Sequence, residues 1–232
     1  MPKSVLLFLL LLCFFSCNRP HDTFSIRGYI ENAAVGDTIC IARFTGTPVL
    51  EDVAHCTVKE GRFGLRGIVE HPAPLYLRYK VQDGYRHCML FMEKGDIGIS
   101  IDTTGCRVTG TLLNDLRNSI EDSITSYLAV LGEIERLYYS AEFNAGQLAH
   151  LSACGLNLQE RLVAYLHTAV KENIHNPLGL YLLVAYSPLF TMQELETLME
   201  QIPDSIIVGS NIPFYTTLTA ILEERKNDSV EI

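Results

Sequence analysis

The chain has 232 residues, of which 48% are hydrophobic and 19% charged, and this composition excludes a disordered protein. Its formal net charge is −9 and it contains no basic run, so nucleic acid is not expected as a partner. The length allows one large domain or two small ones, each with its own hydrophobic core.

Residues 1–16 are predicted to be a secretory leader. The apolar run 5–15 is too short for a helix across a hydrocarbon core about 30 Å thick. Ser16 followed by Cys17 resembles the lipobox of bacterial lipoproteins, although Phe14 departs from the usual first residue of that motif. The resemblance implies that Cys17 carries lipid and becomes the first mature residue. The alternative is ordinary cleavage, which leaves Cys17 as a plain thiol.

A lipid on Cys17 would make the membrane itself a partner and place the chain in the cell envelope. Asn18 is not the aspartate that marks inner-membrane retention in many bacterial lipoproteins, and no acidic run follows Cys17. The expected location is therefore the outer membrane, with the protein facing the periplasm and residues 17–22 acting as a tether.

Residues 23–110 form the predicted sheet region, because apolar residues recur there with a period of two between frequent turn residues. Apolar residues on both faces of 38–44 indicate a central strand. Gly61 is expected to take a positive φ in a tight hairpin. We predict a small antiparallel sandwich or barrel, with strands at 24–30, 38–44, 49–58, 62–67, 75–81, 87–94, 97–101 and 107–109.

Between residues 111 and 226 the apolar period changes to 3.6, which predicts helices. Gly155 leaves open whether the second of them is one helix or two. Thr191 and Glu194 form an expected capping box. A polar tail, 227–232, follows the last helix. Strands first and helices after define an α+β class with an all-helical C-terminal region, its helices expected near 114–139, 147–173, 178–186, 191–201 and 213–225.

The sequence predicts no catalytic residue, no metal ligand and no cofactor site. It contains no C-x-x-C pair, no G-x-S-x-G elbow, no phosphate-binding glycine loop and no two histidines at metal-binding spacing. An oxidising compartment permits one or two disulfides, yet an odd number of cysteines in mostly apolar strands favours buried free thiols. Apart from the leader and Cys17, these cysteines are Cys40, Cys56, Cys88, Cys106 and Cys154.

Two sets of polar side chains are ambiguous. The neighbouring helical carboxylates Glu121, Asp122, Glu133 and Glu135 lie too close in sequence to face each other across a cleft and are interpreted as solvated. Six tyrosines could line a pocket between sheet and helices, or pack in the core with the hydroxyl at its edge. These are Tyr76, Tyr79, Tyr138, Tyr139, Tyr181 and Tyr186.

Five segments, taken in order, form a recognisable pattern: 24–30, 58–63 ending at Gly67, 90–97, 108–110 leading to Asn114 and Asp115, and 173–183. Together they resemble the DUF4369 domain of Bacteroidetes lipoproteins, with a likeness that extends over about 24–224. In many relatives this module precedes a thioredoxin-like domain of the AhpC/TSA type, whose C-x-x-C carries the chemistry and is missing here. The resemblance thus implies a location and a fold without an activity.

These observations predict a membrane-tethered, non-enzymatic module that docks another envelope protein or a small ligand. The alternative is an accessory to periplasmic thiol–disulfide exchange that works with a separate thioredoxin-like protein. A third hypothesis is a hydrolase or other enzyme whose site is assembled from distant residues.

Overall fold

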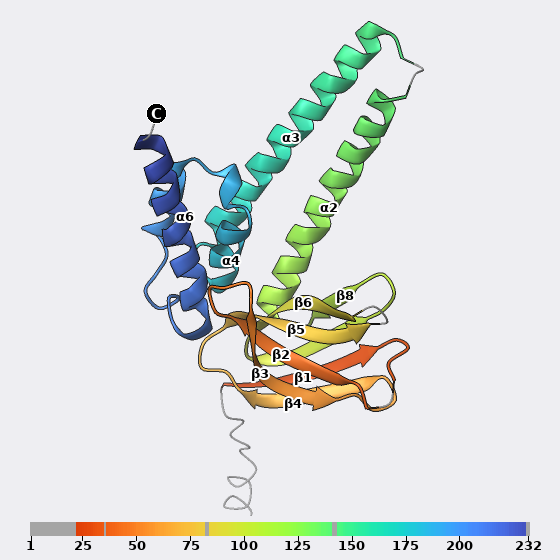
Figure 1. Cartoon of the computed structure of the whole chain (residues 1–232), viewed down its shortest axis with the longest axis vertical. Helices are drawn as coiled ribbons and strands as arrows, with labels where there is room; N and C mark the ends of the chain where they lie inside the picture. The colour runs from red at the N-terminus through yellow and green to blue at the C-terminus, as the bar shows by residue number, and fades with distance from the viewer. Residues whose placement is uncertain (1–21, 35, 82–83, 141–142, 231–232) are drawn as a thin grey trace, which may run out of the picture.

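The structure is a computed structural model that describes residues 22–34, 36–81, 84–140 and 143–230. Two four-stranded sheets come first and the helices follow, which confirms the α+β class (Figure 1). The predicted leader 1–16 lies outside the described residues, as does nearly all of the tether 17–22.

The first sheet has the order β4-β1-β7-β8 and the second the order β3-β2-β5-β6. All pairs are antiparallel except β1 with β7, which is parallel, so the expectation of purely antiparallel strands is wrong there. Two strands joined by a short hairpin must run antiparallel. Five strands separate β1 from β7 in sequence, so the chain can enter β7 in either direction relative to β1. The strands are β1 (Thr23–Ile30), β2 (Thr38–Phe44), β3 (Leu50–Thr57), β4 (Arg62–Ile68), β5 (Ala73–Val81), β6 (Gly84–Met92), β7 (Gly95–Ile101) and β8 (Cys106–Thr109).

Both sheets contribute to one hydrophobic core. Ile26 of β1, Ile39 of β2 and Ile99 of β7 are all buried in it, because alternate residues of each strand point to the same side. β2 lies between β3 and β5, which confirms the prediction of a central strand.

The hairpin between β3 and β4 turns at two residues with positive φ, Glu60 at 51° and Gly61 at 73°. Lys59 and Arg62 exchange backbone hydrogen bonds of 2.8 and 2.9 Å across it. The positive φ expected of Gly61 is therefore confirmed, and this conformation closes a two-residue loop.

Helices α3, α4 and α5 begin at residues whose side chains cap them. Asn144 with Gln147, and Thr191 with Glu194, form capping boxes, and Asn176 accepts hydrogen bonds ahead of Pro177. Helix α3 continues unbroken through Gly155. The helices are α2 (Leu112–Tyr138), α3 (Ala145–Asn173), α4 (Pro177–Ala185), α5 (Met192–Met199) and α6 (Ile212–Val230), with 3-10 turns η1 (Ser187–Leu189) and η2 (Gly209–Asn211).

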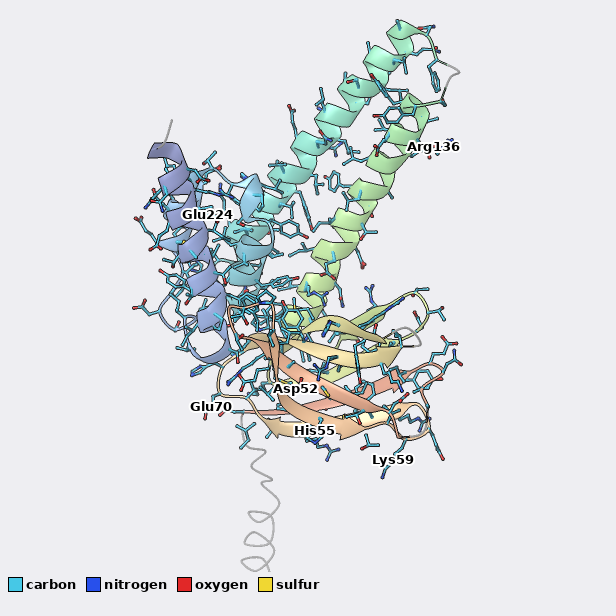
Figure 2. All side chains as sticks on the ribbon, in the orientation of Figure 1. Asp52, His55, Lys59, Glu70, Arg136 and Glu224 are labelled. Atoms are coloured by element: carbon cyan, nitrogen blue, oxygen red, sulfur yellow. A yellow bond between two sulfur atoms is a disulfide. The ribbon has the colours of Figure 1, made fainter. Side chains whose placement is uncertain are left out.

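Helices α2 and α3 form a long antiparallel hairpin, here called the arm, that projects away from the sheets (Figure 1). A second hydrophobic core joins the end of α3, α4, α5 and α6 to Phe91 of β6, near the base of the arm. Arg136 lies near the far end of the arm, whereas Lys59 lies at the opposite end of the molecule (Figure 2).

Candidate functional site

Cys17, the predicted lipid-attachment residue, lies outside the described residues, so lipid attachment there stays a prediction. Among the residues that the structure describes, no helix combines the length and the apolar character needed to cross a membrane.

The cysteines differ from expectation. Cys88 of β6 and Cys106 of β8 form a disulfide with a Cα–Cα distance of 6.0 Å, so the prediction of free thiols is wrong for this pair. They are 18 residues apart in sequence, and only the approach of the two sheets brings them together. Cys40 and Cys56 are half-buried free thiols, and burial raises the pKa of Cys56. Cys154 is exposed on α3, which contradicts its expected burial.

No metal site is formed in the described part of the chain, where no three histidine, cysteine or acidic residues come together. His150 lies one helical turn before Cys154, with 3.7 Å between Nε2 and Sγ.

Three of the six candidate tyrosines gather at the base of the arm. Tyr76, Tyr181 and Tyr186 surround Arg117, and burial raises the pKa of each phenol. The Arg117 guanidinium donates to the Met89 carbonyl at 2.8 Å and pairs with Glu121 at 2.7 Å.

The other three tyrosines lie elsewhere. Tyr79 is buried within the sheet core, and Tyr138 and Tyr139 lie at the far end of the arm, with ring centroids 5.5 Å apart. The tyrosines therefore do not line a common pocket.

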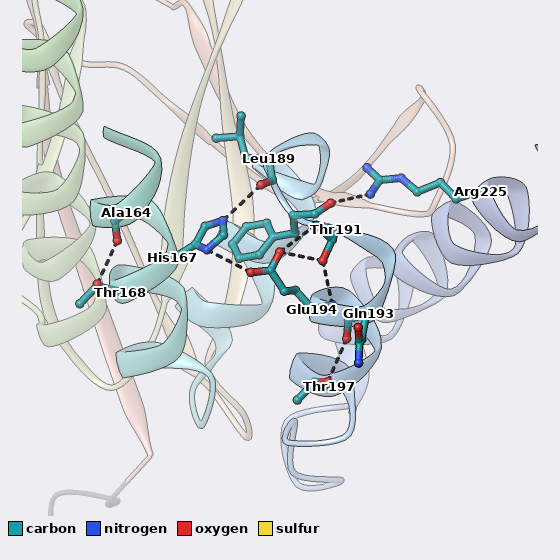
Figure 3. A network of polar contacts seen from close by, with 10 residues as sticks. Ala164, His167, Thr168, Leu189, Thr191, Gln193, Glu194, Thr197 and Arg225 are labelled. Atoms are coloured by element: carbon teal, nitrogen blue, oxygen red, sulfur yellow. Dashed lines mark hydrogen bonds and ion pairs between the residues drawn. The ribbon is translucent and has the colours of Figure 1, made fainter. Parts of the chain in front are cut away.

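A small cleft of about 240 Å³ lies between α3 and α5, with His167 on one wall and Glu194 on the other (Figure 3). The His167 ring stacks on Phe190, with centroids 4.2 Å apart. Its Nε2 is 3.2 Å from the Leu189 carbonyl and its Nδ1 is 3.6 Å from Glu194 Oε1. Both ring nitrogens thus face oxygen atoms.

Glu194 is held by the same network. The backbone N–H and the hydroxyl of Thr191 donate to its carboxylate at 2.9 and 2.8 Å and lower its pKa, and His167 and Lys171 act in the same direction. Because these groups already bind one another, the cleft acts as a clamp between α3 and α5.

The arm begins at a buried set of polar contacts with the sheets. The Glu93 carboxylate accepts from the N–H of Leu113 at 2.7 Å and so caps α2, whose own N-cap residue Thr111 makes no side-chain capping bond. The sequence predicts Glu93 within the strand 87–94 and does not reveal this role. Thr111, an ordinary N-cap residue type, precedes the helix, and 20 residues separate Glu93 from the Leu113 N–H that it caps, so no local signal connects the two.

Further contacts fix the direction of the arm. Asn118 donates to the Val108 carbonyl at 2.6 Å, and Arg107 pairs with Asp122 through two hydrogen bonds of 3.0 and 3.3 Å. The pair of Arg107 and Asp122 borders an open polar groove of about 500 Å³ between β8 and α2. The expected solvated character of Asp122 is confirmed, although it has a partner.

The two helices of the arm pack as an antiparallel coiled coil. The rings of Tyr127 and Tyr165 lie 6.0 Å apart, and Ile134 lies 3.5 Å from where a Cβ on Gly155 would be. Apolar contact positions recur at alternating spacings of three and four, the heptad pattern. They are Ile120, Ile124, Tyr127, Leu131 and Ile134 on α2, and Leu148, Leu151, Gly155, Leu158, Leu162 and Tyr165 on α3.

The arm exposes apolar surface beyond this seam. Of the described residues between Ile124 and Leu166, none is fully buried. Helical spacing puts the exposed residues Leu128, Tyr139 and Leu156 on one side of the arm, with exposed fractions of 54%, 78% and 60%.

The side of the arm that carries Leu128, Tyr139 and Leu156 is here called the apolar side, and helical spacing also places Gly132, Ala149 and Ser152 on it. Residues 145–159 of α3 contain no Asp, Glu, Lys or Arg. Val130, His150 and Cys154 lie on the opposite side, where polar residues predominate. The apolar side is therefore the surface of the arm best suited to contact another molecule.

Comparison with known proteins bears on the first half of the chain. Residues 24–116 match the DUF4369 family, a domain of unknown function. The matched DUF4369 region begins in β1 and ends in the first turns of α2, so it contains both sheets together with the buried contacts that start the arm. The resemblance noted for the helices up to residue 224 stays a prediction. No curated protein matches the chain.

Proposed function

We propose that this protein is a lipid-anchored, non-catalytic docking module of the cell envelope, and that it binds another envelope protein through the apolar side of the arm. The observation that carries the proposal is the exposure of Leu128, Tyr139 and Leu156 on one side of a helical hairpin that projects from the body. Exposed apolar residues grouped in this way are typical of protein interaction sites.

The charges favour a different protein over a second copy. Helical spacing places two carboxylates without an ion pair among the described residues beside the apolar side, Glu135 and Glu160. A second copy would bring such carboxylates together on chains that already have a net charge of −9. The partner is therefore an apolar surface with a basic rim.

The lipid anchor is supported by the leader and by Cys17, and it is tested separately. Cys17→Ala should abolish palmitate labelling and release the protein from the membrane fraction. Equal labelling of variant and wild type would overturn the anchor.

Docking is tested in cells with a photo-crosslinking residue at position 156. We expect one discrete adduct, which Leu128→Glu abolishes, and no adduct from position 130 on the opposite side. An adduct of twice the chain mass would show self-association. Self-association would overturn the docking proposal. The absence of any adduct would overturn it too, as would an adduct that still forms in the Leu128→Glu variant.

A second candidate function rests on Cys154. It is the exposed free thiol of the described residues, and it lies on the arm. Under this alternative the Cys154 thiolate attacks the C-x-x-C disulfide of a separate, oxidised thioredoxin-like protein, which forms a mixed disulfide and releases the second cysteine of that motif as a thiolate. Acid quenching followed by alkylation would trap the adduct, and Cys154→Ser would abolish it. Adduct formation unchanged by Cys154→Ser would exclude this role.

A further inference from the structure

The outer face of the first sheet is basic, although the chain as a whole is acidic. Alternation along the strands points Arg27 of β1, and Arg62 and Arg66 of β4, to the same solvent side. Asp96 is the one acidic residue at the outward positions of β4, β1 and β7, and its contact with Arg27 is 3.9 Å between side chains each 74% exposed. Arg62 and Arg66 form no ion pair with any residue that the structure describes.

This basic face is open and also carries apolar groups. The helices contact β5, β6 and β8, and they leave the outer surface of β4, β1 and β7 uncovered. Tyr29 and Ile68 project from it with exposed fractions of 51% and 72%, and Gly64 and Gly98 flatten the surface beside Arg27. Arginines around an exposed tyrosine and an aliphatic side chain match the interface of a lipid bilayer, where phosphates meet acyl chains.

We propose that this basic face docks on an anionic phospholipid surface, an inference that rests on the lipid anchor of the proposed function. β1 begins at Thr23, six residues after Cys17. Six residues extend over at most about 20 Å, so a lipid on Cys17 would hold the start of this sheet near the headgroups. Attraction between basic residues and anionic lipid acts within about one Debye length, roughly 8 Å, and the tether allows that approach.

The arm leaves this face uncovered. Helix α2 leaves the body at β6 and β8, whereas β4 is the edge strand at the other end of the first sheet (Figure 1). Helix α2 has 27 residues and is therefore about 40 Å long. The apolar side of the arm is thus free to meet a partner while β4 and β1 contact the lipid.

The test uses the mature chain without its lipid, as a Cys17→Ser variant, mixed with phosphatidylcholine vesicles with or without phosphatidylglycerol. We expect binding to the anionic vesicles alone, weakening as salt is raised. Arg27→Gln with Arg66→Gln should weaken binding by about fivefold per arginine, roughly 25-fold for the pair. The matched control, Arg86→Gln with Arg161→Gln, removes the same charge from other surfaces and should change binding little.

Three results would overturn the inference: no binding to anionic vesicles, equal loss in both double variants, or tighter binding of the same face to a single-stranded oligonucleotide than to vesicles. All four substituted arginines are exposed, so unchanged thermal unfolding would confirm that each variant is folded. Because the assay omits the lipid and the partner, its outcome is independent of palmitate labelling and of crosslinking at position 156.

Discussion

Asn114 and Phe91 bind each other in both directions. The Asn114 side-chain carbonyl accepts from the Phe91 N–H at 2.8 Å, and the Asn114 amide donates to the Phe91 carbonyl at 2.8 Å. Asn114 is fully buried, and its amide also donates to the Thr111 hydroxyl. One side chain at the start of α2 thus continues the hydrogen bonding of β6 and ties the arm to the sheets.

We predict that Asn114→Ala lowers the free energy of unfolding by roughly 2–4 kcal/mol, because it leaves buried donors and acceptors of Phe91 without partners. Chemical denaturation measures this effect. Asn157→Ala, at an exposed position on α3, is the control and should have little effect. Equal stability of Asn114→Ala and the wild type would show that this contact does not hold the arm.

Gly61→Val should destabilise the sheets by about 2 kcal/mol, because a β-branched residue is strained at a φ of 73°. Its Cβ would also lie 3.0 Å from the Ile30 carbonyl oxygen. Gly61→Asn, which tolerates this conformation better, should cost much less. A melting temperature equally low in both variants would point to packing instead of backbone strain.

Removal of the disulfide with Cys88→Ala and Cys106→Ala should cost about 3 kcal/mol, since the bond closes a loop of 18 residues in the unfolded chain. Reductant should lower the melting temperature of the wild type toward that of the double variant and leave the variant unchanged. If reductant does not change the melting temperature of the wild type, the disulfide is absent or contributes nothing to stability.

Cys154 should react rapidly with a maleimide in the native protein, while the half-buried Cys40 and Cys56 react slowly until denaturant is added. Mass spectrometry after brief labelling of the mature Cys17→Ser chain would find one modification, and none when Cys154→Ser is added. We also expect no turnover in an insulin-reduction assay, because strand register places Cys40 and Cys56 on opposite faces of their sheet. Turnover that depends on Cys154 would instead support a redox role.

The clamp around Glu194 predicts a pH dependence. A carboxylate with a lowered pKa stabilises the fold fully above its unfolded value, about 4.5, and this contribution is lost as pH falls through the folded value. Glu194→Ala should therefore be less stable than the wild type by about 0.5–1 kcal/mol at pH 7, with the difference vanishing in acid. Glu200→Ala is the control, because the Glu200 side chain has no partner among the described residues. A constant difference at all pH values would exclude the carboxylate as the cause.

Features encoded by neighbouring residues could be predicted from the sequence. Alternation predicted the strands that contain Ile26 and Ile99, the turn before Arg62 predicted a positive φ for Gly61, and Thr191 with Glu194 predicted the start of α5. In each case the pattern that carries the prediction spans only a few neighbouring residues, so backbone geometry alone decides it.

The tertiary structure decided what depends on residues far apart in the chain. The disulfide between Cys88 and Cys106, the capping of α2 by Glu93 and the parallel pairing of β1 with β7 all join segments from different strands or helices. The apolar period and the composition of the sequence are the same whichever strands become neighbours, so neither of them could predict these long-range contacts. The apolar period of α2 and α3 likewise predicted two helices, but their separation from the rest of the core, which leaves Leu128 and Leu156 exposed, follows from how the helices pack.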